Sequence, residues 1–383
     1  MSDFRIQQIF LNGFDEYSGR YHPSDVQMKA ALSIMHCKSG TLGRNATICT
    51  DCGHVEFHNN SCRNRSCPNC QAVLKEVWID QRRSEVFDMK YFHAVFTLPA
   101  QLNPLIYANQ KLLYSLMHRC SADVLLQLAK DRKYLGATPS IIQVLHTWGQ
   151  TLNFHPHIHC IVSGGGLTDD LKVRECGRSF FAPVKVMAAL FRGKFLDTLK
   201  EYYQSGMLEF PSSCQDIASP AAWDSFISKL YEIEWCPYIK ETFNGFGNAI
   251  DYLGRYTHRI AITNSRIKSV TDSSVTYAAR DYRTGETEDI TISCAEFIRR
   301  FLQHVLPSGF QKIRYFGLLA GRVKKRNLRI VFELQGRQQF TSRFSNASTA
   351  DIILAVWGHD IRRCPICGQR SMRQIGRSYA LLE

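Results

Sequence analysis

The chain has 383 residues, and 45% of them are hydrophobic, which is enough for a sizeable core and excludes wholesale disorder. Lysine and arginine outnumber aspartate and glutamate by 47 to 34, so the formal net charge is +13. An excess of this size is typical of proteins that bind phosphate groups, and it exceeds what solubility requires. The composition therefore favours a nucleic acid as the partner.

The N-terminal residues MSDFRIQQIF lack the basic segment and the long apolar run of a secretory signal, which argues against secretion. No stretch approaches 18 uninterrupted apolar residues, so we expect no membrane-spanning helix. Of the 14 cysteines, six stand in three C-x-x-C pairs. We expect a cytoplasmic protein, and in a reducing cytosol such pairs indicate metal ligands rather than disulfides.

The first part of the chain predicts helices followed by a small module. Residues 1–36 form a helical lead-in, whereas residues 37–75 lose apolar periodicity and are dominated by Cys, Asn, Arg and Gly. Such a change is typical of a module held together by metal. A further helix is expected from Ala72 to about Phe87.

Two C-x-x-C pairs in this module, Cys49 with Cys52 and Cys67 with Cys70, are separated by 14 residues. Each pair can direct two thiolates at one ion, and four thiolates form a closed tetrahedral zinc site. The separation falls just short of the usual range of about 15–20 residues. Two further residues inside the module could replace one ligand, namely Cys62 and His54. We therefore expect a structural zinc ion that orders a segment too small to fold on its own core.

Basic side chains accompany the second half of this module. Arg63 and Arg65 lie among asparagines just before Cys67. Guanidinium and amide groups suit contacts with phosphates or base edges, so both arginines are candidate DNA-binding residues.

The rest of the chain alternates between predicted strands and helices. In chain order, the patterns predict a strand at 91–98, a helix at 104–130, strands at Ile141–Trp148 and His157–Val162, helices at Val184–Tyr203 and 221–231, and a strand at Trp235–Lys240. A helix at Asn248–His258, β-like segments at 260–264, 268–279 and 288–293, and a helix at 295–305 complete the series. This mixture predicts an α+β fold with a central antiparallel sheet flanked by helices.

The segment around His157 and His159 is the sharpest local signal. Alternate residues of a strand face the same side, so these two histidines point together, while Ile158 and Cys160 face the core. Two imidazoles on one face form half of a divalent-metal site. The alternative is a pair of solvated histidines, or of histidines whose hydrogen bonds are satisfied in the core.

A third metal ligand must come from another part of the chain. The polar loop just upstream offers Gln150, with His146 as the alternative. His155 could extend the row of histidines, although Pro156 bends the chain between it and His157.

A second candidate site lies on the helix expected at Asn248–His258. Tyr252 and Tyr256 are four residues apart, which places them one turn apart on the same face. A tyrosine oxygen can form a covalent intermediate, but its free pKa of about 10 means that nearby cations or a metal must assist. Arg255 and Arg259 supply positive charge and are candidate phosphate ligands. By itself such a pair is more often packed against a core.

Together these parts resemble the HUH superfamily of single-strand endonucleases, and more closely the rolling-circle insertion-sequence transposases of the insertion sequence ninety-one type. The resemblance covers most of the chain. The segments that carry it are Asn60-Ser61-Cys62-Arg63-Asn64-Arg65, Phe92 to Pro99, Leu145 to Gln150, His155 to His159, Asp251 to Arg259 and Phe301 to Pro307.

The resemblance implies an HUH-type nuclease domain that nicks and rejoins single-stranded DNA at the ends of a mobile element. In this family a tyrosine attacks a phosphodiester, leaving a 5′-phosphotyrosine and a free 3′-hydroxyl. By this resemblance Tyr252 and Tyr256 are the nucleophiles, and His157, His159 and Gln150 hold Mg or Mn. The implied partners are single-stranded and duplex DNA in the bacterial nucleoid, and an oligomer is compatible with this activity.

The sequence departs from the family at one position. Ser66 stands where the family often has a histidine, just before Cys67, and this favours the zinc site of Cys49, Cys52, Cys67 and Cys70. There is also a chemical tension at the catalytic site, because imidazole generally suits zinc or iron better than Mg.

The C-terminal part is basic. The segment from Lys312 to Arg329 carries seven basic side chains, of which Lys324, Lys325 and Arg326 are the candidate DNA ligands. Residues 361–377 add five arginines and the pair Cys364 and Cys367.

One C-x-x-C pair cannot close a tetrahedral site. Cys364 and Cys367 could recruit His359 or another cysteine, form half of a site shared between chains, or remain a surface thiol pair without metal. The sequence thus divides into a helical and zinc-binding module at 1–90, a catalytic domain at 91–265 and a basic C-terminal region at 266–383.

Three other functions fit parts of this pattern. A replication initiator or a relaxase would use the same metal and tyrosine chemistry. A non-enzymatic zinc-containing DNA-binding protein explains the charge and the cysteines but leaves the histidines and tyrosines without a role. A metal-dependent hydrolase without a covalent step predicts indifference to replacement of the tyrosines.

Overall fold

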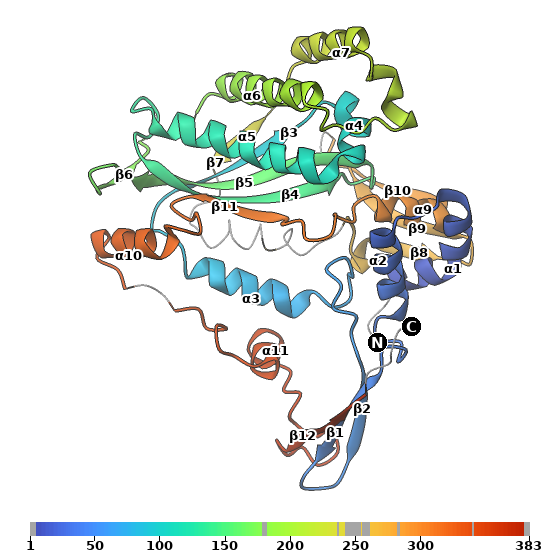
Figure 1. Ribbon diagram of the computed structural model, residues 1–383. Coiled ribbons are helices and arrows are strands. Elements are labelled where there is room, and N and C mark those ends of the chain that lie inside the picture. Colours follow the sequence, from blue (N-terminus) through green and yellow to red (C-terminus); the bar gives the residue numbers. More distant parts are fainter. Residues whose placement is uncertain are drawn as a thin grey trace.

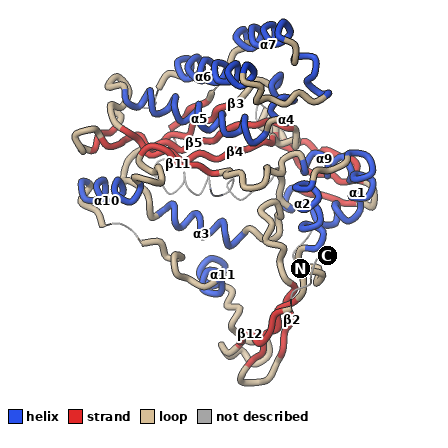
Figure 2. The backbone as a smooth tube through the Cα atoms, in the orientation of Figure 1, coloured by secondary structure: helices blue, strands red, loops and turns tan. Residues whose placement is uncertain are grey.

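The computed structural model describes residues 5–177, 182–235, 237–241, 254, 261–281, 284–338 and 341–378. Figure 1 shows a central sheet between layers of helices, a second small sheet covered by helices beside it, and a narrow three-stranded extension. Figure 2 marks the same division, with the strands of the extension well separated from the central sheet. The predicted α+β class, with a central antiparallel sheet flanked by helices, is confirmed.

The central sheet has the strand order β11-β4-β5-β3-β7, with β6 paired to β5, and its described pairs are antiparallel. Its strands are β3 (Tyr91–Thr97), β4 (Thr138–Trp148), β5 (Phe154–Leu167), β6 (Val173–Glu175), β7 (Tyr238–Glu241) and β11 (Ile313–Gly317). The strand predicted at His157–Val162 extends to Leu167 because glycines continue it. A Cβ atom at Gly166 would overlap the carbonyl oxygen of Thr138, so only glycine lets β4 and β5 come this close.

One face of the sheet is covered by a helical layer and by the largest core cluster (Figure 1). This layer consists of α4 (Asn103–Ala108), α5 (Gln110–Lys130), α6 (Val184–Gln204) and α7 (Pro220–Glu232), with short 3-10 turns at Ala100–Leu102 and Ser212–Ile217. The helix predicted at 104–130 is broken at Asn109. The Asn109 side chain accepts a bond from the backbone N–H of Glu209 at 2.9 Å and donates one to the Glu209 carbonyl at 2.9 Å. This exchange with a distant segment explains why the helical pattern is interrupted.

The opposite face is covered by α3 (Ala72–Arg83) and α10 (Lys324–Leu334). Trp78 and Ile79 of α3 share a buried cluster with Val144 of β4 and Ile161 of β5. The helix α11 (Thr349–Trp357) lies against α3 at its outer side (Figure 1). The described residue Gly254 also lies against α3, since a Cβ atom there would overlap the side chain of Ile79.

The second sheet, of order β10-β9-β8, forms a separate core with helices from the start of the chain. Its members are α1 (Arg5–Tyr21), α2 (Asp25–His36), the 3-10 turn Asn264–Arg266, β8 (Ile267–Val270), β9 (Ser274–Arg280), β10 (Thr287–Ser293) and α9 (Cys294–Leu302). The segment predicted at 268–279 is thus a hairpin of two strands. The first β-like segment, 260–264, is wrong in its described part, since residues 261–263 form no strand and Asn264 begins the 3-10 turn. The aromatic rings of Phe10 and Phe301 meet edge to face at 5.4 Å across α1 and α9.

The extension is built from both ends of the chain. It has the order β12-β1-β2, with β1 (Arg44–Cys49), β2 (Val55–Asn59) and β12 (Met372–Arg377). The register pairs Cys49 with Met372, so the C-terminal strand completes the N-terminal module. Contacts therefore cross the three predicted ranges. β11, from the range 266–383, lies in the central sheet, and α1 and α2, from the range 1–90, pack on residues 261–302.

Among the residues that the structure describes, no helix combines the length and the apolar character that crossing a membrane requires.

Two glycines of α1 provide a test of the packing between α1 and α9. A Cβ atom at Gly13 would lie 2.5 Å from Cys294 Cβ and 2.8 Å from its carbonyl carbon, whereas one at Gly19 meets nothing within 4 Å. Gly13→Ala should therefore lower the free energy of unfolding by about 1–3 kcal/mol, because backbone atoms of α9 must move. Gly19→Ala, the matched control, should raise it by about 0.5–1 kcal/mol through helix propensity. Urea unfolding of both variants measures the difference, and equal stabilities would refute this close contact.

Candidate functional site

The predicted histidine pair lies on the face of the central sheet that α3 covers. Ile158 and Cys160 are fully buried in the helical layer on the other face, as predicted. The antiparallel register places His146 of β4 directly opposite His157 of β5. Because cross-strand partners share a face, β4 contributes a third imidazole next to the predicted pair.

The three imidazoles form a compact group. One ring nitrogen from each of His146, His157 and His159 lies within 4.8 Å of the other two. The Nε2 atoms of His157 and His159 are 3.1 Å apart, and the ring centre of His146 lies 4.4 Å from that of His159. His146 is 2% exposed, so this side chain forms the buried wall of the group, while the other two are partly accessible.

The remaining ring nitrogens of the pair are held by neighbouring groups. His157 Nδ1 lies 2.7 Å from the His155 carbonyl, to which it donates, and this leaves His157 Nε2 as an acceptor. His159 Nδ1 lies 2.8 Å from Nε2 of His93 on β3. If Nδ1 donates here too, two acceptor nitrogens face each other at 3.1 Å, an arrangement that a shared cation stabilises.

Burial keeps these imidazoles neutral. Desolvation lowers the pKa of His157 to about 4 and that of His93 to about 4, and it lowers the pKa of His159 well below its usual value. Neutral imidazole is the form that binds metal. The donor set therefore fits a divalent ion at neutral pH without first having to lose protons.

An aromatic ring and a lysine border the group. Trp148 stacks on His146 with ring centres 4.6 Å apart, and Lys312 Nζ lies 4.8 Å from the centre of the Trp148 ring. Burial, and to a lesser extent the charge of Arg65, lowers the pKa of Lys312 to about 7. Lys312 belongs to the basic run predicted from the sequence, but the fold brings it to the histidines instead of to the surface.

The structure places Gln150 in the turn between β4 and β5. Its backbone carbonyl accepts a bond from Arg266 at 2.6 Å. His146, the alternative to Gln150, lies in the histidine group, and Gln150 as a ligand stays a prediction. Tyr252, Tyr256, Arg255 and Arg259 lie outside the described residues.

His93 is a site residue that the sequence patterns did not single out. It contacts His159 directly, and their rings stack with centres 5.1 Å apart. The segment around it was predicted as a strand, but the pairing of that strand with β5 was not. Only this pairing brings His93 and His159 together.

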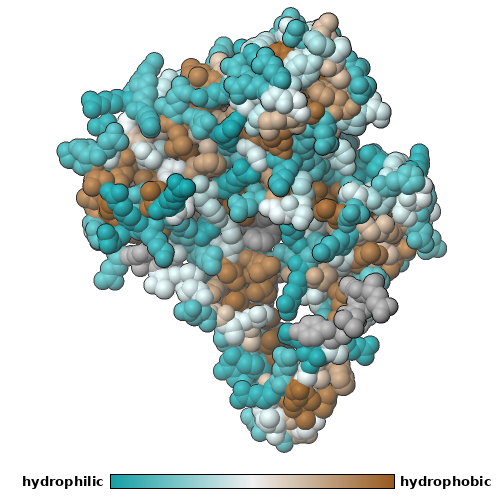
Figure 3. Space-filling view, viewed as in Figure 1, coloured by the Kyte–Doolittle hydropathy of each residue, from teal (hydrophilic) through white to brown (hydrophobic). Residues whose placement is uncertain are grey.

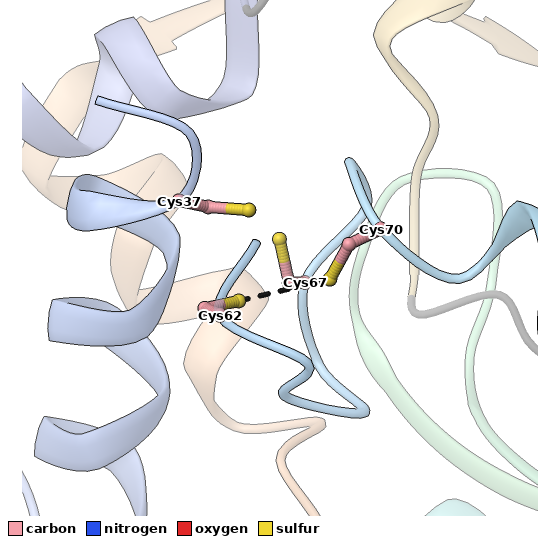
Figure 4. Close-up of side chains that lie close together, drawn as sticks. All are labelled: Cys37, Cys62, Cys67 and Cys70. Carbon is pink, nitrogen blue, oxygen red and sulfur yellow. Dashed lines mark hydrogen bonds between the residues drawn. The ribbon is translucent and has the colours of Figure 1, made fainter. Parts of the chain in front are cut away.

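The predicted zinc ligands do not share one site, which corrects the grouping expected from their spacing. Cys67 and Cys70 converge with Cys37 and Cys62, as Figure 4 shows, and one sulfur from each lies within 4.8 Å of the others. Cys62 had been considered as a substitute ligand, whereas Cys37, just after α2, had not. Cys62 Sγ and Cys70 Sγ are 3.7 Å apart.

Cys49 and Cys52 lie in a second group together with Cys364 and Cys367. The physical reason is the β1–β2 hairpin. Cys49 and Cys52 lie at its far end, and β2 spans roughly 17 Å as an extended strand before the chain reaches Cys62. His54 stands in neither group; its Nε2 lies 3.7 Å from Glu56.

Two of the predicted DNA-binding side chains have structural partners. Arg65 donates to the carbonyls of Leu306, Pro307 and Phe310 at 2.9, 2.7 and 2.7 Å, so it ties the first cysteine group to the segment before β11. Lys324 Nζ lies 2.5 Å from a carboxylate oxygen of Glu85. Arg65 is nevertheless exposed and Lys324 is partly exposed, so the role of both in DNA binding stays a prediction.

Three other described candidates are also exposed. Arg63 is exposed, and its backbone has the left-handed conformation, with φ 55°. Lys325 and Arg326 are exposed at the start of α10. Their role in DNA binding stays a prediction.

A buried histidine beside the site predicts a pH dependence of stability. His304 is 2% exposed, its Nδ1 lies 3.1 Å from Thr147 Oγ1, and its Nε2 lies 3.1 Å from the Leu152 carbonyl. Burial lowers its pKa from 6.5 to about 3. Since the folded pKa is lower, the unfolded chain binds the proton first, and stability falls as the pH drops from about 6.5 towards 3.

From this group alone we expect about 2 kcal/mol less stability at pH 5 than at pH 7.5. Urea unfolding at both pH values, for the wild type and for His304→Gln, measures the contribution. The difference between the two pH values should be smaller in the variant by that amount. An equal pH dependence in both proteins would contradict the assignment.

Comparison with known proteins gives the family of the chain. The family model described as "Putative transposase" (Y2_Tnp) matches residues 140–327, which include most of β4, all of β5 and the three histidines. A second model, described as "Transposase zinc-binding domain" (Zn_Tnp_IS91), matches residues 9–98, which include the whole first cysteine group. The N-terminal module is thus a zinc-binding one. No solved structure matches the chain significantly.

Two curated relatives align along nearly the whole chain. It is 38% identical over 372 residues to the protein named "Putative transposase y4qJ" of Sinorhizobium fredii, which covers 96% of this chain and 94% of that protein. It is 30% identical over 355 residues to the transposase for insertion sequence element IS801 of Pseudomonas savastanoi, with coverage of 90% and 83%. Transposases cleave and join DNA at the ends of mobile elements. The chain belongs to the IS91 family of transposases.

Proposed function

We propose that this transposase nicks and rejoins single-stranded DNA at the ends of its element through a 5′-phosphotyrosine intermediate, and that the element moves by a rolling-circle-like route. The observation that carries the proposal is the group of three imidazoles on one sheet face, in a chain of a transposase family. A regulator that only binds DNA would have no use for such a group.

His146, His157 and His159 hold a divalent ion in this proposal. A divalent ion held there would polarise the scissile phosphate and stabilise the charge that develops on it. Nitrogen ligands are less suited to Mg than to transition ions, so of the two expected ions Mn fits this donor set better. His93 is a positioning residue, because its contact with Nδ1 of His159 orients that ring.

The nucleophile is one of two tyrosines. The oxygen of Tyr252 or Tyr256 forms a bond to phosphorus, the bond from phosphorus to the 3′-oxygen breaks, and that oxygen leaves as a 3′-hydroxyl after gaining a proton. The tyrosine proton passes to solvent or to a nearby base. Gly254, which stands between the tyrosines in the sequence, lies against Ile79 of α3, on the sheet face of the histidines.

Positive charge near the histidines assists the substrate. The pKa of Lys312 is about 7, so this lysine is partly neutral at neutral pH. A phosphate bound nearby would raise that pKa and so favour the charged form of the lysine. Arg63, Lys325 and Arg326, with Arg255 and Arg259, are the proposed contacts with the rest of the DNA backbone. Duplex DNA at the element ends is engaged through the same contacts.

The first cysteine group binds the zinc ion of the N-terminal module. Cys37, Cys62, Cys67 and Cys70 form a closed four-thiolate set, which is typical of a structural site without catalytic water. Arg65 links this group to the segment that leads into β11 and Lys312. In this proposal the zinc site fixes the position of Arg65, and Arg65 in turn helps to fix the segment before β11.

The test uses single-stranded DNA with the end sequence of the element, labelled at either terminus. The protein and Mn are added, and the mixture is denatured. A 5′-phosphotyrosine predicts that 3′-labelled DNA stays attached to the protein, while 5′-labelled DNA is released with a 3′-hydroxyl that a polymerase can extend. Retention of the 5′ label, or no adduct with either label, would overturn the proposal.

A further inference from the structure

The second cysteine group lies where the two ends of the chain meet. Cys49 and Cys52 follow β1, and Cys364 and Cys367 precede β12. One sulfur from each lies within 4.8 Å of the other three. The pairs come from segments more than 300 residues apart, so neither C-x-x-C turn needs the other for its local geometry.

The sulfur spacing matches tetrahedral coordination. Cys49 Sγ is 3.6 Å from Cys367 Sγ, and Cys52 Sγ is 3.7 Å from Cys364 Sγ. Four thiolates at a zinc–sulfur distance of about 2.3 Å place neighbouring sulfurs about 3.8 Å apart. All four are free thiols.

The two turns repeat one hydrogen-bond pattern. The backbone N–H of Gly53 donates to the Cys49 carbonyl at 3.0 Å, and that of Gly368 donates to the Cys364 carbonyl at 3.0 Å. The N–H of the first cysteine donates to the carbonyl five residues later in both, to His54 and to Gln369, at 2.8 Å. Both glycines have positive φ, 74° and 72°. Two turns of the same shape thus face each other, each presenting two sulfurs to one point.

The surrounding structure is too small to hold the cysteines together by itself. The buried cluster of the extension consists of Cys49, Cys364 and Met372. Several large apolar side chains here are exposed, among them Phe57 at 66% and Ile366 at 70%. Figure 3 shows such a hydrophobic area at the narrow lower end of the molecule. A three-stranded sheet with so few buried side chains requires a further constraint.

We propose that Cys49, Cys52, Cys364 and Cys367 bind a second structural zinc ion, which fastens the C-terminal segment to the N-terminal zinc module. The strand β12 pairs with β1, and the Thr50 N–H donates to the Ser371 carbonyl at 3.1 Å. Before reaching this point the chain passes α3, where Arg343 Nε lies 3.0 Å from a carboxylate oxygen of Asp80. The zinc therefore anchors the far end of the segment that contains α11. This segment packs on α3, on the side of α3 away from the sheet.

The test counts thiolate-bound zinc in the full-length protein purified with zinc. A mercurial reagent, which attacks thiolates and not imidazoles, should release two zinc ions per chain from the wild type. The variant Cys364→Ser/Cys367→Ser should release one. Cys214→Ala, which removes a buried cysteine outside both groups, should still release two. One ion from the wild type, or two from the double serine variant, would overturn the proposal.

Two further measurements protect the test against misfolding of the variant. When zinc is replaced by Co in the wild type, the intensity of the sulfur-to-metal absorption band should correspond to eight Co–S bonds per chain. An intensity that corresponds to four Co–S bonds would refute a second site. Hydrogen exchange should become faster in Met372–Arg377 of the double serine variant while β5 keeps its protection. Neither readout involves DNA or a tyrosine, so the result is independent of the proposed strand transfer.

Discussion

Replacing both Tyr252 and Tyr256 by phenylalanine is expected to reduce the covalent DNA adduct by at least about a thousandfold, because the reaction has no substitute for the attacking oxygen. The change removes only two hydroxyl groups, so zinc content and affinity for single-stranded DNA should be unchanged. The adduct is measured by denaturing electrophoresis with 3′-labelled DNA and Mn. Tyr231→Phe, on the exposed surface of α7, is the matched control and should keep full activity.

The single variants separate the roles of the two tyrosines. In a scheme with two tyrosines, each one cleaves the DNA once. If Tyr252 attacks first, Tyr252→Phe should lose the first nick. Tyr256→Phe should form the first adduct but fail to make the second cleavage. An undiminished adduct in the double variant would contradict both assignments. A metal-dependent hydrolase predicts a different result, since water would then be the nucleophile: nicking would continue in the double variant, and no adduct would form even with the wild type.

The second large effect is expected at the third metal ligand. His146→Gln should weaken Mn binding by at least about 100-fold, because it removes one of three imidazole ligands, whereas Gln150→Ala should change it little. His93→Ala should lie between them, at about 10–100-fold, since His93 only orients His159. Titration of Mn by electron paramagnetic resonance measures the affinities, and urea unfolding checks that each variant is folded.

The adduct assay adds a functional readout to the same variants. Higher Mn concentrations should restore adduct formation to His93→Ala, because a positioning residue affects occupancy more than chemistry. His146→Gln should retain its zinc content, as both cysteine groups lie elsewhere. A large loss of Mn affinity in Gln150→Ala with none in His146→Gln would reverse the assignment and return Gln150 to the site.

The strand carrying the histidines was predictable because its signal is local. Side chains of a strand alternate between two faces, so a sequence that alternates His157, Ile158, His159 and Cys160 already separates ligands from core. The structure confirms that Ile158 and Cys160 are buried. The predicted α+β class follows from the same kind of evidence, since periodicity and turn residues act over short ranges.

The partners of those residues were not predictable in the same way. His146 was only an alternative to Gln150, because the choice depends on the register between β4 and β5, and His93 depends on the pairing of β3 with β5. Asn109 interrupts a helical pattern through a bond to Glu209, about a hundred residues away. Each of these features depends on a contact between segments that are far apart in the sequence, and the periodicity of hydrophobic residues within one segment carries no information about such contacts.

By itself, the sequence determined the fold class, the basic character, the histidine strand and the presence of metal-binding cysteines, because composition and short-range spacing encode these features directly. Only the tertiary structure decided how the cysteines are divided. A regular spacing suggested one site from Cys49, Cys52, Cys67 and Cys70, but the β1–β2 hairpin carries the first pair away from the second. Four thiolates can share an ion only where the backbone brings them within about 4 Å of one another, and here that distance is set by strand pairing between the two ends of the chain.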